Sequence, residues 1–329
     1  MKRLSITIGF LFSFVFMWFA LKDTNWNAIS SSFKQANPWY VVPMMVCLAS
    51  YYFLRAARWS RILSTSHNAT ALELTAPLLI GAAGNNLLPA HMGELVRIYY
   101  AGTKLQVPKS TVLGTLVVER LFDLMAVLIL FAVALLHVNI SEKLPWLAGL
   151  LMLATLALYF TCWLISKYPN RFLSILTQLT FALPPKVSRA VTYHTGKLAD
   201  GLSMLRSAKE LGLVTLNSFA QWFFMAGCIY SSMLAFDLTA GISAATVVLG
   251  VTVIGLLLPT SPGFFGTIEY AFVLGLGFVG VDASTAFSIA VFYHLPIWAV
   301  ISLSGIVCFV VKDYSVREIT DLGKNRDRT

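Results

Sequence analysis

Long apolar runs separated by short polar stretches extend along the whole chain. A helix needs ~20 apolar residues to cross ~30 Å of hydrocarbon, and six runs reach or approach that length. They cover residues 4–21, 39–54, 111–137, 145–166, 211–234 and 286–311. The pattern therefore predicts an all-α protein with about six spanning helices.

Two further apolar stretches are interrupted near their middle by polar, Gly- and Pro-containing sequence. The first interruption reads GNNLLPAHMGELVR over residues 84–97, and the second reads PTSPGFFGTIE over residues 259–269. Counting charges places both ends of each stretch on one side of the membrane. We therefore expect two re-entrant helical hairpins, near 74–101 from the cytoplasmic side and near 242–280 from the outer side. Broken segments at corresponding places in two halves suggest an inverted repeat around a midplane site.

Composition and charge distribution place the protein in a membrane. Hydrophobic residues make up 57% of the chain and charged residues only 12%. Of the 24 Lys and Arg residues, 20 lie in the predicted cytoplasmic stretches 1–4, 55–109, 167–209 and 312–329. This bias predicts that both termini are cytoplasmic and that the net charge of +9 reflects topology rather than nucleic-acid binding. We expect the protein in the cytoplasmic (inner) membrane.

The same reading divides the chain into four parts. Residues 1–166 form a first membrane half, 167–209 a cytoplasmic amphipathic linker, 210–311 a second membrane half and 312–329 a cytoplasmic tail. In the linker, basic residues alternate with apolar ones at near-helical spacing. That pattern suits a helix lying on an anionic leaflet, and equally a linker that packs between the halves.

The first interruption contains groups that can contact a polar ligand. Asn85 and Asn86 offer amide side chains where regular helix is expected to stop, and Glu94 and Arg97 then share one face of the following helix. They can pair with each other or hold a head group between them. Because a guanidinium binds phosphate through two parallel hydrogen bonds, Arg97 is a candidate for phosphate. The alternative is a structural cap and ion pair.

The next predicted span carries the sequence VERLFD. Glu119 and Asp123 lie one turn apart on the same face, and Arg120 can reach Asp123. Charges at membrane depth require partners or a wet cavity. The spacing leaves open whether these three charges bind a substrate or only lock the helix to Arg97, and we interpret Arg120 and Asp123 as a structural lock and Glu119 as a site residue.

The second interruption places Gly263 and Gly266 just ahead of a helix. Free N–H groups at a helix start, together with the positive end of its dipole, can hold an anion. Glu269 in the first turn can cap that helix or can couple proton or cation movement. His294 precedes Pro296 by two residues and is interpreted as a hydrogen-bonded core histidine, with titration as the alternative.

No metal site or nucleotide site is expected. Cys47, Cys162, Cys228 and Cys308 lack C-x-x-C spacing, and the chain contains no Walker A sequence. We therefore expect no cofactor.

At these residues the chain resembles a known family. The ordered motifs NNLLPxxxGELVR, VERLFD and PxSPGxxGxxE are similar to those of the flippase-like family named for the transmembrane region of lysylphosphatidylglycerol synthase. The chain departs from that family's pattern at His91, where Arg is common, and at Phe264, where a second Gly is common. Bifunctional relatives carry a cytoplasmic synthase domain, whereas only 18 residues, 312–329, follow the last predicted span here. We therefore expect no aminoacyl transfer.

The resemblance implies a membrane protein that moves or presents a lipid between leaflets. We expect an anionic phospholipid or lipid-linked substrate to contact Arg97, Arg120 and the backbone at Gly263–Gly266, with a separate lipid-modifying enzyme or a second copy of the chain as further partners. Two alternatives stay open. One is a membrane subunit or scaffold that assists a lipid-modifying enzyme, and the other is a membrane-embedded enzyme using Glu94, Glu119 or Glu269.

Overall fold

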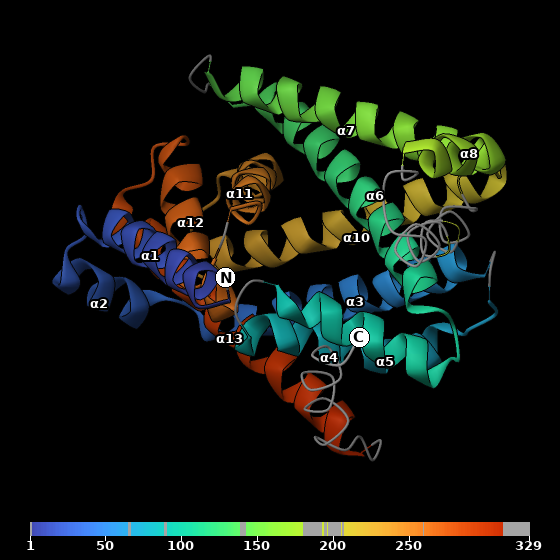
Figure 1. Ribbon diagram of the computed structural model, residues 1–329. Helices are drawn as coiled ribbons and strands as arrows, with labels where there is room; N and C mark the ends of the chain where they lie inside the picture. The colour runs from blue at the N-terminus through green and yellow to red at the C-terminus, as the bar shows by residue number, and fades with distance from the viewer. Residues whose placement is uncertain are drawn as a thin grey trace.

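The computed structural model describes residues 2–64, 67–88, 91–138, 143–179, 193, 196, 205, 207–258 and 260–311. These residues form helices joined by turns, with no strand among them (Figure 1). Up to residue 179 the elements are α1 (Lys2–Leu21), α2 (Trp26–Gln35), η1 (Pro38–Tyr40), α3 (Val41–Leu63), α4 (Ala71–Leu87), α5 (Met92–Lys104), α6 (Lys109–Leu135), α7 (Lys143–Lys167) and α8 (Pro169–Leu179). After residue 206 they are α10 (Ala208–Leu234), α11 (Gly241–Gly255), η3 (Pro262–Phe264), α12 (Thr267–Gly277) and α13 (Ala283–Val311). The predicted all-α fold is confirmed.

The six predicted spans fall on α1, α3, α6, α7, α10 and α13. In the described residues, three helical segments are both long and apolar enough to cross a membrane, namely Pro38–Leu63, Ala208–Leu234 and Ala283–Val311. Phe10–Leu21, Met152–Ile165 and Gly241–Gly255 are shorter apolar segments. The number of crossings, the positions of the termini and the division of the chain stay predictions. Most of the predicted linker and the whole predicted tail, 312–329, lie outside the described residues.

Helix boundaries follow from local capping chemistry. Thr70 and Glu73 form a capping box at the start of α4, in which each side chain accepts a hydrogen bond from a backbone N–H of the other residue. The Ser207 hydroxyl accepts from the Glu210 N–H and begins α10 in the same manner. These contacts satisfy backbone donors that a helix start would otherwise leave without partners.

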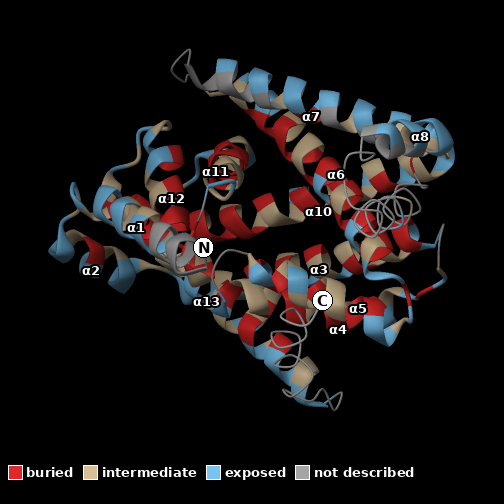
Figure 2. Cartoon of the chain, in the orientation of Figure 1, coloured by how far each residue is buried: buried red, intermediate tan, exposed pale blue. Residues whose placement is uncertain are grey.

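Helix α10 lies at the centre of the molecule and packs against α3, α6 and α11, whereas α13 packs along α4 and α12 (Figure 1). Buried residues gather where these helices meet, and the outer face of α7 is largely exposed (Figure 2). The exposed side chains there include Trp146, Leu153 and Phe160. An apolar outer surface of this kind is suited to lipid rather than water.

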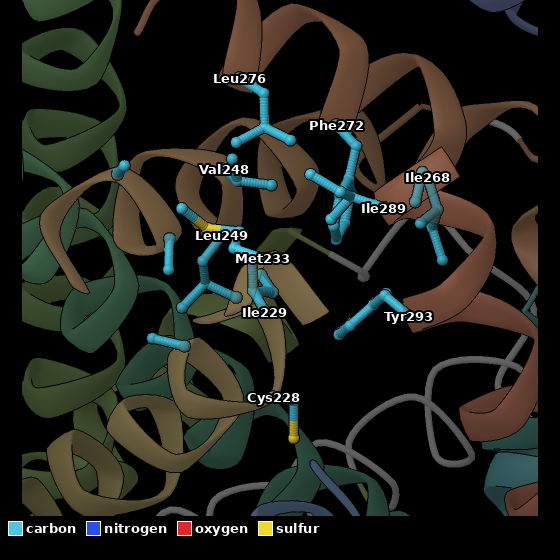
Figure 3. Close-up of a cluster of buried hydrophobic side chains, with 14 of the residues drawn as sticks. Cys228, Ile229, Met233, Val248, Leu249, Ile268, Phe272, Leu276, Ile289 and Tyr293 are labelled. Carbon is cyan, nitrogen blue, oxygen red and sulfur yellow. The ribbon is translucent and has the colours of Figure 1, made fainter. Parts of the chain in front are cut away.

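The main hydrophobic cluster joins α3, α6, α10, α11, α12 and α13. Figure 3 shows its centre, where Phe272 and Ile289 meet Val248, and where Met233 lies beside Leu249. These side chains are almost fully enclosed. The cluster holds α11 and α12 against the long helices and so fixes the position of the segment between them.

Two antiparallel helix pairs lie at the places where the sequence predicts hairpins. Helix α4, which ends at Leu87, packs against α5, which begins at Met92, and α11, which ends at Gly255, packs against α12, which begins at Thr267. We refer to Leu88 and His91 as the first break and to residues 260–266 as the second break, since residues 89, 90 and 259 lie outside the described residues. Whether either pair enters and leaves the membrane on one side stays a prediction.

The backbones of α4 and α5 approach each other closely, with glycines at the contact. A Cβ atom built on Gly93 would collide with the backbone of Gly81 and Asn85, and one built on Gly84 would lie 2.8 Å from the Gly93 Cα. Ala83 and the backbone of Leu79 approach Gly305 of α13 in the same way. Close packing of this kind makes the first helix pair a rigid unit against α13.

Replacing Gly93 with Ala tests this packing. Because the new methyl group meets backbone, we expect Gly93→Ala to destabilise the protein by about 1–3 kcal/mol or more, despite the better helix propensity of Ala. The measurement is thermal unfolding of the purified protein in detergent. Gly212→Ala in α10 is the matched control, since its Cβ would meet nothing within 4 Å, and it should leave the unfolding temperature unchanged or slightly raised. Equal effects of the two changes would contradict the close approach.

Candidate functional site

Seven charged side chains from α3, α5 and α6 meet on one side of α10. They are Arg55, Arg58, Glu94, Arg97, Glu119, Arg120 and Asp123, which we call the charged cluster. It contains four guanidinium groups and three carboxylates. Because arginine stays protonated and each carboxylate faces at least one arginine, the cluster carries a surplus of one positive charge.

Glu119 is the enclosed centre of this cluster. Its side chain is 0% exposed and accepts two parallel hydrogen bonds from Arg97, each 2.8 Å long. Arg55 donates to the same carboxylate from Nη2 at 2.9 Å and from Nε at 3.2 Å. The Arg97 guanidinium also lies 3.7 Å from the centre of the Trp59 ring. Two cations and one anion therefore stabilise one another away from lipid.

Asp123 forms a second enclosed centre one helical turn further along α6. Its Oδ1 accepts hydrogen bonds from Arg58 at 2.7 Å, from Trp222 Nε1 at 2.9 Å and from Gln221 Nε2 at 3.1 Å. Arg58 also donates to the Ser218 hydroxyl at 2.7 Å. The i, i+4 spacing on α6 thus presents one carboxylate to α5 and the next to α10.

The open edge of the cluster is made by Arg120 and Glu94. The Arg120 side chain is 46% exposed and that of Glu94 is 25% exposed. They form an ion pair, and Arg120 Nη1 also lies 3.5 Å from Asp123 Oδ2. Glu94 Oε2 is buried and has no hydrogen-bond donor in the described part of the chain. This edge therefore has an accessible cation and an unused carboxylate acceptor side by side.

The two asparagines of the first interruption do not enter the cluster. Asn86 donates from Nδ2 to the Trp298 carbonyl at 3.2 Å and to the Ser302 hydroxyl at 3.0 Å, so it ties α4 to α13. Asn85 Oδ1 is buried and lacks a hydrogen bond among the described residues. Glu94 and Arg97 share a helix as expected but pair with Arg120 and Glu119 instead of with each other.

The second break does not present an open anion cradle, contrary to expectation. The Gly266 N–H donates to Glu269 Oε2 at 2.6 Å, so the chain's own carboxylate occupies the helix start. Glu269 Oε1 lies 2.6 Å from His294 Nδ1, and His294 Nε2 lies 2.8 Å from the Gly263 carbonyl. The physical reason is that Glu269, in the first turn of α12, reaches back and accepts from the N–H of Gly266, the residue that caps the helix start.

The glycines of the second break are required by its backbone. Gly263 and Gly266 have φ values of 71° and 86°, in the left-handed region that a residue with a Cβ adopts only at a cost. The Trp298 ring also lies against Gly263, because its Nε1 would be 2.9 Å from an added Cβ. Pro259, at the start of the interruption, lies outside the described residues.

The two breaks touch each other. The His91 and Phe264 rings are 5.4 Å apart between centroids, and both residues have positive φ values of 54° and 63°. These are the two positions at which the chain departs from the family pattern. The structure thus brings together the two interruptions that the sequence singles out. Helix α5, which follows His91, carries Glu94 and Arg97 of the charged cluster.

The distribution of exposure favours roles opposite to those predicted for α6. Glu119, expected as a site residue, is fully enclosed between two arginines, whereas Arg120, expected as part of a lock, is half exposed. Arg55 and Arg58 also belong to the cluster, although the charge distribution places them among the predicted cytoplasmic residues. The available signal was their i, i+3 spacing at the end of an apolar run, which puts both on one helical face. In the described residues no group of three or more His, Cys, Asp or Glu side chains is arranged to hold a metal ion.

Comparison with known proteins gives a consistent picture. Residues 6–305 match the family described as Lysylphosphatidylglycerol synthase TM region. Two UPF0104 membrane proteins of Methanocaldococcus jannaschii are similar: MJ1078 is 26% identical over 70% of this chain and 95% of its own length, and MJ1595 is 20% identical over 93% and 94%. Glycosyltransferase AglD of Haloferax volcanii is 27% identical over 38% of this chain and 20% of its own length. No solved structure matches the chain significantly.

Neutralising Glu119 tests whether the enclosed centre holds the fold. We expect Glu119→Gln to destabilise the protein by about 3–5 kcal/mol, because Arg97 and Arg55 would keep their buried charges without an anion. Denaturant unfolding in detergent gives the free energy. The control is Arg61→Gln, which removes an exposed ion pair to Glu210 and should cost about 0–1 kcal/mol. Similar losses in the two variants would mean that the enclosed pair does not stabilise the fold.

Proposed function

Because the chain belongs to the family of the lysylphosphatidylglycerol synthase transmembrane region, we propose that this integral membrane protein moves or presents an anionic lipid or lipid-linked molecule between bilayer leaflets. The observation that carries the proposal is the surplus positive charge of the charged cluster. A net charge inside a membrane protein is costly unless a ligand or counter-ion neutralises it. An anionic head group supplies the missing charge.

The open edge at Arg120 is the proposed point of contact. The Nη groups of Arg97 and Arg58 donate to Glu119, Asp123 and Ser218, so binding a head group through them would break short internal hydrogen bonds. Arg120 is accessible and its guanidinium can bind phosphate through two parallel hydrogen bonds. Arg55, whose side chain is 12% exposed, is the next available cation.

Glu94 extends the proposal to the rest of the head group. Its unused Oε2 accepts a hydrogen bond, so a donor beside the phosphate, such as a hydroxyl or an amine, fits the same edge. We therefore propose a substrate that combines a phosphate with at least one hydrogen-bond donor. Asn85, with a buried and unused acceptor near the first break, is a further contact on the path of such a head group.

A second candidate is assistance to a separate lipid-modifying enzyme. The similarity to one fifth of Glycosyltransferase AglD supports it, since a related segment there forms part of a longer protein named as an enzyme. In this case the chain presents a lipid-linked substrate to the enzyme. Product formation by a lipid-modifying enzyme that requires this chain in detergent, where leaflets are absent, favours presentation over movement between leaflets.

Arg120→Gln tests the proposed contact. We expect the rate at which a fluorescent phosphatidylglycerol exchanges between leaflets of reconstituted liposomes to fall by roughly 10- to 100-fold, since a charge-assisted pair to phosphate is lost. The measurement is the fraction of probe that an impermeant quencher reaches with time. Folding of the variant is checked by its unfolding temperature.

Arg61→Gln is the matched control for this experiment. Arg61 and Arg120 are exposed to nearly the same extent, 44% and 46%, and each pairs with a glutamate. The control should move lipid at the rate of the unchanged protein. If the two variants move lipid equally well, Arg120 is not the contact; if the unchanged protein moves no anionic lipid, the proposed movement is wrong.

A further inference from the structure

Glu269 and His294 form a hydrogen-bonded pair that the charged cluster does not include. Both residues are only 3% exposed, and the pair lies between the end of the second break and the middle of α13. One chain of contacts runs from the Gly266 N–H through Glu269 Oε2 and Oε1 to His294 Nδ1, and from His294 Nε2 to the Gly263 carbonyl. The pair thus holds the second break at two points three residues apart.

The contacts determine how many protons the pair carries. His294 Nε2 faces a carbonyl oxygen, which only accepts, so Nε2 carries a hydrogen. The 2.6 Å contact between Nδ1 and Oε1 needs one hydrogen between the two atoms, on either partner. The pair therefore holds one proton more than a neutral histidine beside a carboxylate.

Either change in proton number breaks one of these contacts. Without the shared proton, the lone pairs of Nδ1 and Oε1 face each other at hydrogen-bond distance and repel. With a second proton, Glu269 is neutral beside an imidazolium, which leaves a buried charge without its anion and puts the new hydrogen on the oxygen that accepts from Gly266. We propose that Glu269 and His294 form a proton-binding site that holds the second break closed when it carries one shared proton and releases it when that proton is lost or a second is bound. The only chemical change is a proton passing between water and the pair.

The other contacts around the pair and the second break are made by uncharged side chains. The Phe265 ring lies 4.7 Å from the His294 ring, and the Ser13 hydroxyl of α1 accepts from the Ser261 N–H. Neighbouring titratable groups are engaged elsewhere: the Tyr293 hydroxyl donates to Met225 Sδ, and the Tyr270 ring stacks on Phe16. In the described parts of the elements packed on α12 and α13, no other charged side chain forms an ion pair or hydrogen bond with the pair.

The state of this pair also reaches the first break. His294, Trp298 and Ser302 recur at intervals of four on one face of α13. The first contacts the second break, the Trp298 ring lies against Gly263, and the Trp298 carbonyl and Ser302 hydroxyl accept from Asn86 of α4. Release of Gly263 therefore also frees its neighbour Phe264, whose ring lies against His91 across the two breaks.

Proton binding by Glu269 and His294 can be tested without lipid movement. Coupling of that proton to lipid movement rests on the proposed function. Protection of the Gly266 N–H from hydrogen exchange reports the local site directly, because that amide donates to Glu269. We would follow hydrogen exchange of the full protein in detergent across pH, in peptides covering residues 260–268, and correct each rate for the intrinsic effect of pH. Peptides of α7, which packs on α6 and α8, serve as the internal reference.

The unchanged protein should show slowest corrected exchange in an intermediate pH window, and roughly tenfold or faster exchange on both sides of it, as expected for loss of a charge-assisted hydrogen bond. Glu269→Gln is the matched variant. Its amide oxygen accepts from Gly266 and its NH2 donates to the Nδ1 lone pair of neutral His294, so the contacts persist without the shared proton, and only protonation of His294 would break them. Corrected exchange in this variant should therefore stay slow on the high-pH side of the window and rise on the low-pH side alone.

Corrected exchange of the unchanged protein that does not vary with pH, relative to α7, overturns the proposal even if Glu269→Gln fails to fold. Equal pH dependence in the unchanged protein and a folded Glu269→Gln variant also overturns it. A lipid arm then separates the two proposals: with a pH gradient across liposomes, movement of fluorescent phosphatidylglycerol should respond to the gradient in the unchanged protein and not in Glu269→Gln. If the exchange window is present but the unchanged protein moves no lipid, the proposed function fails and the proton site stands.

Discussion

The bidentate pair between Arg97 and Glu119 is the interaction on which the arrangement of α3, α5 and α6 depends. Neither group can be left alone in the protein interior, because an unpaired buried charge costs several kcal/mol, on the order of 3–5 when a partner is removed. Arg97 belongs to the helix that follows the first break, and Glu119 to the helix after that. Their union therefore fixes how far α5 can move from α6, and Arg55 adds α3 to the same unit. The close backbone packing of α4 on α5 carries this constraint to the first break.

Internal pairing does not neutralise the cluster, and this leaves room for function. Glu119 and Asp123 are shared among three well-enclosed arginines, so the remaining cation, Arg120, must be balanced by Glu94 at the edge. The enclosed pairs provide rigidity and the edge pair provides access. A ligand that replaces Glu94 as the partner of Arg120 changes the contact at the exposed edge. A ligand that displaced Glu119 from Arg97 would disrupt the fold.

Hydropathy predicts the helices well because burial in lipid acts on every residue of a span, and Gly and Pro mark the breaks because backbone geometry there is local. The apolar runs thus identify α3, α10 and α13, and the GNNLLP and PTSPGFFG sequences identify the two breaks. Partner choice is not local. Arg55 and Arg58 read as cytoplasmic charges until α6 is placed beside α3, and the exposure of Arg120 relative to Glu119 depends on which face of α6 meets α5. Likewise, the carboxylate that fills the second break belongs to the chain itself, which spacing alone allowed but did not require.

Helix α13 explains how the two breaks can act together although the charged cluster touches only one of them. Its residues 294, 298 and 302 form a single stripe that contacts the second break at one end and Asn86 at the other. These contacts share one face of α13 although Pro296, within the stripe, removes one backbone hydrogen bond, and Gly305 lets α4 approach the helix closely. Trp298 therefore contacts both Gly263 and Asn86, whereas Arg97 pairs with Glu119 away from this stripe. Under the proposed proton site, we expect a change at His294 to act on the contact between His91 and Phe264, where the two breaks meet.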